Sequence, residues 1–355
     1  LAPMIPAYLA AAANAVLVHG LQVDVRDYRA FLLPDPWSPW FYVEALVVAG
    51  LAYTLWIQVR ALLLDRWPAE RRRASRRGWL LEAGLPLALG LLAGLWLLAT
   101  VVVHRTHGVT ASDPYAYTQM AIDLAERGTP QHSFPIAALA RELGLPTWPT
   151  VHIGYHPPGP DGRAPTMWSI GWPLLLAPVY RIGGLEAVYW AAPLTGLLAL
   201  LATALLVDEA LKNLLRGIRW SVAALCCALV ATSPEGSERL LVPMADAAAQ
   251  LFAVLTLWVL LRGGRARTIR SVALHGTLAG LCFGAAYWVR HPLLPLGAAA
   301  VAAALFGSLR VPRPRSRRDR VSRWVLPLSF ALAALLVALP DLAFHKRAYG
   351  GWLTS

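Results

Sequence analysis

Long apolar runs constrain the fold of this chain more than any other feature of its sequence. Residues 40–64, 79–103 and 324–344 are apolar over at least the roughly 20 residues that a helix needs to cross a bilayer, and each run holds at most two charged residues. Charged residues make up only 15% of the 355 residues, whereas soluble domains carry about 25%. The sequence therefore predicts an all-α integral membrane protein, folded as a polytopic bundle of transmembrane helices.

The positive charge of the chain is concentrated in short connections between apolar runs. The formal net charge is +12, and segments 66–77, 212–219, 262–270 and 310–323 hold six, three, four and seven of the 32 Lys and Arg residues. Basic residues at helix ends stay on the cytoplasmic side of a membrane, so we assign these four segments to the cytoplasm. This placement argues against a basic tail for nucleic acid, and we expect no nucleic-acid partner.

The cytoplasmic assignments determine the rest of the predicted topology. Residues 104–167 form the longest polar stretch and lie outside as the first external loop, while residues 168–180 are too short to span and become an interfacial segment. Residues 1–78 are predicted to add an N-terminal helix pair to a core of residues 79–355, giving about nine spanning helices in all. The predicted spans after 79–103 are residues 186–207, 220–231, 246–261, 271–289, 293–306 and 324–344.

A short polar segment opens the first external loop. Ser112 or Asp113 is a good helix N-cap, and Pro114 suits the first helical position, so an amphipathic helix is predicted from here to Gly128. On these local grounds Asp113 is either a helix cap or an external carboxylate with a function of its own.

Several segments share their order along the chain and their predicted external side. They are Ser112-Asp113-Pro114-Tyr115-Ala116-Tyr117, His156-Pro157-Pro158-Gly159, Trp168-Ser169-Ile170-Gly171-Trp172-Pro173, Met244-Ala245-Asp246-Ala247, Val289-Arg290-His291-Pro292 and Ala348–Ser355. Together they resemble the signature segments of GT-C glycosyltransferases, which include lipid A aminoarabinose transferases and protein O-mannosyltransferase-like enzymes. The residues around Arg290 depart from the family's T-R-P turn by carrying Val289 and an inserted His291.

The resemblance covers residues 79–355 and implies a GT-C-like fold whose large external loop carries short amphipathic helices. Longer relatives continue with further helices, so we expect this chain to lack the family's C-terminal part. The implied reaction is an inverting transfer of a sugar from a polyprenyl-phosphate to a hydroxyl of an acceptor lipid, protein or glycan. The implied location is the external face of a prokaryotic plasma (inner) membrane, with the bilayer as a partner.

The resemblance also assigns roles to charged residues. Asp113 is the expected catalytic base, Asp246 is the second catalytic carboxylate, which orients acceptor or donor groups, and Arg290 is the group that binds the departing phosphate. A structural role remains open for each, since Asp246 can cap its helix and Arg290 can be an arginine that extends from a helix end toward the membrane surface.

The remaining candidates are aromatic residues and histidines. Tyr115, Tyr117, His156 and Trp172 are the expected substrate-binding residues, although tryptophan is also common in the aromatic belt of a membrane protein. His152 and His156 have the i,i+4 spacing of a metal site for Mg²⁺, Mn²⁺ or Zn²⁺, while the Gly and Pro residues around them argue against a helix there.

Two other functions are compatible with the sequence. A noncatalytic GT-C-like subunit or scaffold of a membrane complex would bury Asp113 as a cap. A lipid or polyprenol transporter would need a polar path through the midplane of the membrane, and charges within the apolar runs are few.

Overall fold

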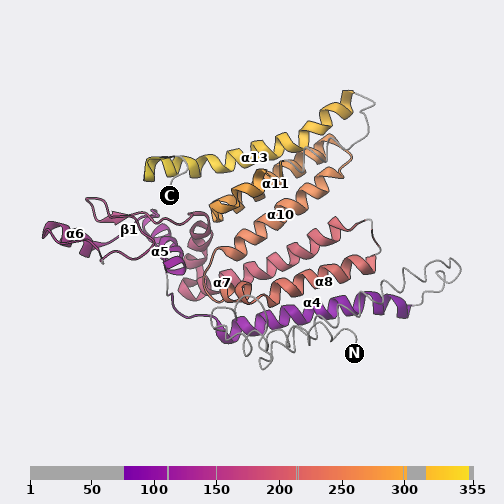
Figure 1. Cartoon of the computed structure of the whole chain (residues 1–355), viewed down its shortest axis with the longest axis horizontal. Helices are drawn as coiled ribbons and strands as arrows, with labels where there is room; N and C mark the ends of the chain where they lie inside the picture. Colours follow the sequence, from indigo (N-terminus) through magenta and orange to yellow (C-terminus); the bar gives the residue numbers. More distant parts are fainter. Residues whose placement is uncertain are drawn as a thin grey trace, which may run out of the picture. The chain divides into compact units, whose positions relative to one another are not determined.

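The structure is a computed structural model, and it describes residues 76–109, 112–148, 150–212, 214, 216–298, 300–301 and 317–351. The predicted N-terminal helix pair lies outside these residues, and the predicted span 293–306 lies partly outside them. The described chain is mostly helical, as predicted (Figure 1). Four of its helices are long and apolar enough to cross a membrane: α7 (Gly171–Ala210), α10 (Asp246–Gly264), α11 (Ile269–Val289) and the part Trp324–Arg347 of α13 (Arg317–Tyr349).

The predicted spans agree with these helices to within a few residues at most of their ends. The shorter apolar stretches Gly90–His104 of α4 (Arg76–His104) and Arg219–Thr232 of α8 (Arg216–Thr232) coincide with two further predicted spans. An integral membrane protein with several spanning helices is therefore supported. The total of about nine spanning helices stays a prediction.

The described residues divide into two compact units, those of 76–100 with 203–238 and those of 101–202 with 239–351. In the first unit, ion pairs hold the connection between α7 and α8. Arg219 pairs with Asp208 at 3.1 Å, and Lys212 pairs with Glu209 at 3.3 Å. The basic segment 212–219 thus neutralises acidic residues at the end of α7.

In the second unit, α11 packs between α10 and α13 (Figure 1). Gly276, Gly280 and Gly284 lie one turn apart on the face of α11 that meets α13. A Cβ atom at Gly280 would lie 2.9 Å from the backbone nitrogen of Ala334, which is closer than real Cβ atoms approach backbone. Small residues at this spacing let two helices approach closely where apolar surroundings supply no hydrophobic drive.

A break in the backbone divides α7. Gly184 has φ 64° and ψ −158°, values that belong to no helix and that side chains with a Cβ rarely adopt. The predicted short segment 168–180 and the predicted span 186–207 lie on either side of this residue. The sequence therefore located the break correctly.

The loop predicted to be external, residues 104–167, holds the short elements α5 (Ser112–Arg127), β1 (His132–Ser133), α6 (Pro135–Glu142) and β2 (Arg163–Ala164). The helix predicted to end at Gly128 is confirmed, and this glycine has φ 67°. The antiparallel ladder that pairs His132 with Ala164 departs from the all-α prediction. Strands of two residues carry no alternating apolar pattern, so the sequence offered no signal for them.

Candidate functional site

An arginine–aspartate cluster joins the ends of α10 and α11. Asp246 is the first residue of α10, and Arg290 follows the last residue of α11. The guanidinium group of Arg290 donates to Asp246 Oδ1, and Arg239 Nη1 donates to the same oxygen at 3.1 Å. Asp246 Oδ2 is buried and, among the described residues, meets no hydrogen-bond donor. We refer to Arg239, Asp246 and Arg290 as the arginine–aspartate cluster.

Packing around Trp172 holds this cluster in place. Trp172 is only 2% exposed, and its indole nitrogen donates to the carbonyl oxygen of Pro243 at 3.0 Å. Its ring belongs to a buried group that includes Ala245 and Val289, the residues just before Asp246 and Arg290. Buried tryptophan usually needs such a partner for its N–H. Trp172 therefore acts first as a structural support for the cluster.

Tyr117 on α5 packs in the same buried group, which includes the residues just before Asp246 and Arg290. Burial raises the pKa of the Tyr117 phenol above its usual value, the positive charge of Arg290 opposes this rise, and the carboxylates of Asp113 and Asp246 add to it. The phenol therefore stays protonated at neutral pH and can donate a hydrogen bond. Asp113, half-buried in the first turn of α5, lies one helical turn before Tyr117.

Four residues selected from the sequence are thus brought together: Asp113, Tyr117, Asp246 and Arg290. They come from α5, the start of α10 and the end of α11. The start of the loop is fastened to the same region, because the Thr106 amide donates to the Leu241 carbonyl at 2.9 Å.

Tyr115 and His152 belong to a second cluster inside the loop. Their rings stack with centroids 4.1 Å apart. Burial raises the pKa of Tyr115, and the charge of Asp123 adds to the rise. Trp168 packs against both this loop cluster and the group around Trp172. Tyr115 and His152 are therefore supports of the loop fold in this structure.

His152 and His156 lie on irregular backbone, as the Gly and Pro residues around them predicted. His152 Nδ1 lies 2.7 Å from the carbonyl oxygen of Ile153, and the His156 amide donates to the Pro165 carbonyl at 2.9 Å. A metal at this pair stays a prediction. Among the described residues, the grouping of three or more side chains placed to hold a metal consists of His291, Asp341 and His345 instead.

Asp123 is a buried carboxylate on α5 that the sequence did not single out. Asp123 is 1% exposed, and its Oδ2 accepts from the Gln119 amide at 3.3 Å and lies 2.8 Å from His132 Nδ1. Arg127 pairs with Oδ1 at 3.2 Å. Asp123 lies between the buried residues Ala121 and Ala125, a position that could have marked it as a carboxylate in need of partners.

We expect Asp123→Asn to lower the free energy of unfolding by about 1–3 kcal/mol, because it removes the charge that His132 and Arg127 meet in a buried position. Thermal unfolding of the purified protein in detergent measures this change. The matched control is Asp161→Asn, because Asp161 is exposed and its ion pair with Arg163 spans 3.9 Å. An Asp123 variant as stable as the control would contradict the prediction.

Comparisons of the chain with models of known protein families, with curated proteins and with solved structures find no match.

Proposed function

We propose that this chain is a GT-C-type glycosyltransferase, which moves a sugar from a polyprenyl-phosphate to an acceptor hydroxyl with inversion. We place the reaction at the external face of a prokaryotic plasma membrane. One observation carries the proposal: Arg239 and Arg290 both donate to the Asp246 carboxylate, and Tyr117 packs against Ala245 and Val289, the residues just before Asp246 and Arg290.

The arginine–aspartate cluster suits a phosphate group. Two guanidinium groups share one carboxylate, which leaves an excess of positive charge at the helix ends. Arginine binds phosphate through paired, charge-assisted hydrogen bonds, and stabilising charge on a leaving group is a large contribution to catalysis. Arg290 is 38% exposed and can exchange Asp246 for the phosphate of the donor.

In the proposed reaction Asp113 takes the proton of the acceptor hydroxyl. The acceptor oxygen then forms a bond to the anomeric carbon, while the bond between that carbon and the phosphate oxygen breaks and the phosphate leaves with the electron pair. Asp246 Oδ2 can accept a hydrogen bond from the sugar or the acceptor, and Tyr117 can donate one.

An apolar surface on the loop supports a donor that stays in the bilayer. Ile136 and Leu139 on α6 are 66% and 53% exposed, and Leu143 beyond the helix is 64% exposed. Apolar side chains on one face of a short helix favour a position at the membrane surface. A polyprenyl-phosphate presents its phosphate at the same depth.

The test is sugar transfer by the purified protein in nanodiscs, with radiolabelled polyprenyl-phosphate sugars as donors. We expect Asp113→Asn to lower the transfer rate by about 10²-fold or more, because general-base catalysis contributes about 10²–10⁴-fold. Asp161→Asn, an exposed change in the same loop, should transfer at the wild-type rate.

Transfer that survives in a folded Asp113→Asn protein would rule out this residue as the base. Absence of transfer by the wild type across a broad panel of donors and acceptors would contradict the enzyme and favour a noncatalytic subunit of a membrane complex.

A further inference from the structure

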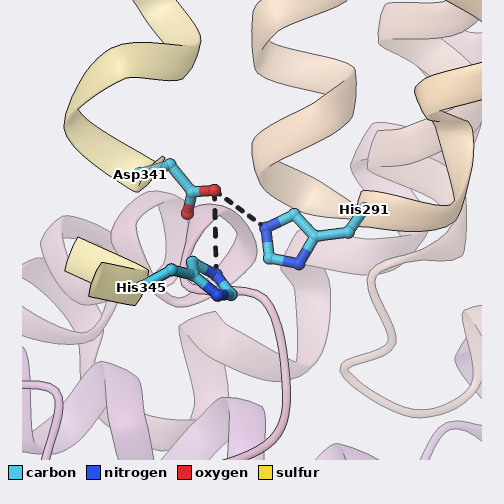
Figure 2. Close-up of side chains that lie close together, drawn as sticks. All are labelled: His291, Asp341 and His345. Atoms are coloured by element: carbon cyan, nitrogen blue, oxygen red, sulfur yellow. Dashed lines mark hydrogen bonds and ion pairs between the residues drawn. The ribbon is translucent and has the colours of Figure 1, made fainter. Parts of the chain in front are cut away.

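Three side chains with metal-binding atoms converge where η4 (His291–Leu293) meets the C-terminal part of α13 (Figure 2). His291 Nε2 lies 3.1 Å from Asp341 Oδ2, and His345 Nε2 lies 3.8 Å from the same oxygen. The ligand atoms of all three residues lie within 4.8 Å of one another. Asp341 and His345 are one turn apart on α13, so both face η4.

The three side chains are more buried than ionisable groups usually are. The Asp341 side chain is fully buried and that of His345 is 7% exposed, whereas that of His291 is 22% exposed. An ionised group within a membrane-spanning helix is costly unless it is paired or has a function. The hydroxyl of Tyr287 interacts with the Asp341 carboxylate. Asp341 Oδ1, however, meets no hydrogen-bond donor among the described residues.

The distances approach those of a tetrahedral metal site. Bonds of about 2.0–2.2 Å from Zn²⁺ to imidazole nitrogen and carboxylate oxygen place neighbouring ligand atoms about 3.3 Å apart. The two separations from Asp341 Oδ2 lie on either side of this value, so small side-chain rotations would close the site. Two imidazoles and one carboxylate favour Zn²⁺ or a similar transition metal over Mg²⁺ and Ca²⁺, which prefer oxygen ligands.

We propose that His291, Asp341 and His345 bind a divalent transition metal, with Zn²⁺ as the expected occupant and a fourth coordination position left open. The metal would neutralise the buried carboxylate and tie η4 to α13. His291 is exposed enough to admit the ion, and the Tyr287 ring, 4.9 Å from its own, restricts its orientation. This proposal does not depend on sugar transfer, because it concerns other side chains than Asp113, Asp246 and Arg290.

The alternative is a hydrogen-bonded network without a metal, in which a protonated histidine supplies the positive charge. Measurement of Zn²⁺ binding distinguishes the metal site from this network. Protein carrying no polyhistidine tag is reconstituted in nanodiscs and treated with a chelator, and Zn²⁺ binding is then measured by calorimetry and by elemental analysis after dialysis.

We expect a single saturable Zn²⁺ site in the wild type. His345→Ala and Asp341→Asn should each weaken binding by about 100-fold or more, because loss even of a group that only orients a ligand costs about 10–100-fold. His104→Ala, which changes an exposed histidine at the end of α4, is the matched control and should bind like the wild type. Wild-type protein that takes up no Zn²⁺, or His345 and Asp341 variants that bind as tightly as the wild type, would overturn the proposal, as would loss of the site in the His104 variant.

A second measurement needs no variant. Co²⁺ bound to the wild type should give the intense visible absorption of a tetrahedral site with nitrogen and oxygen ligands, and Zn²⁺ should displace it. The weak spectrum of octahedral Co²⁺ would overturn the proposed geometry even if the Asp341 or His345 variants failed to fold.

Discussion

Replacing Gly171 with alanine is expected to lower the free energy of unfolding by about 2–3 kcal/mol, because the added methyl group overpacks a site with no room to yield. Gly171 begins α7, where it lies directly against the last turn of α11. A Cβ atom there would lie 2.6 Å from the backbone nitrogen of Val289 and inside van der Waals contact with the carbonyl group of Trp288. These atoms belong to a helical backbone and cannot rotate away as a side chain could.

The same substitution should also disturb the arginine–aspartate cluster, since Arg290 follows Val289 directly. The added methyl group should push the end of α11 away from the start of α7 and thereby move Arg290 relative to Asp246. The contact between the His291 amide and Ser169 Oγ, 3.5 Å long, should also be lost. Thermal unfolding in detergent measures the loss of stability.

Gly264→Ala is the matched control for this experiment. Gly264 is the last residue of α10, and a Cβ atom there would meet nothing within 4 Å. Alanine also favours a helix by up to about 1 kcal/mol over glycine, so this variant should be as stable as the wild type or slightly more so. Equal destabilisation of the two variants would show that the contact of Gly171 with α11 is not what matters.

The sequence predicted those features that local physics decides. The spans 246–261 and 271–289 end within three residues of α10 and α11, because an apolar run of bilayer length has no other stable conformation in lipid. Gly128 ends α5 as predicted. Asp246 and Arg290 were selected for one site by the resemblance of their segments to those of glycosyltransferases, and the structure pairs the two side chains.

The sequence could not reveal contacts that depend on how two helices pack. Asp341 and His345 have a recognisable i,i+4 spacing, but only the close packing of α11 against α13 brings His291 to them. The spacing of Gly276, Gly280 and Gly284 is the feature of the sequence that indicates this packing, but no helix pairing was predicted from it. Likewise, Asp123 contacts His132 only because the chain turns at Gly128 and then forms β1.

Two substitutions in the arginine–aspartate cluster should separate stability from sugar transfer: Asp246→Asn should lower stability more, and Arg290→Ala should lower transfer more. Arg290→Ala leaves Asp246 with a partner, because Arg239 Nη1 still lies 3.1 Å from its Oδ1. Asp246→Asn instead leaves two guanidinium groups facing each other without a counterion. We therefore expect Asp246→Asn to lower the free energy of unfolding by about 1 kcal/mol more than Arg290→Ala does, a modest amount because both arginines are partly exposed.

If Arg290 binds the phosphate of the donor, Arg290→Ala should lower the rate of sugar transfer more than Asp246→Asn does. Arg290→Ala removes charge that stabilises the leaving group and should lower kcat/KM by about 10²–10³-fold. Asp246→Asn keeps both arginines and should lower it less. Unfolding curves and transfer rates of the two variants, measured on the same preparations, decide the matter. If the variant with the larger loss of stability also has the larger loss of kcat/KM, Arg290 contributes through stability alone, and the phosphate-binding role is wrong.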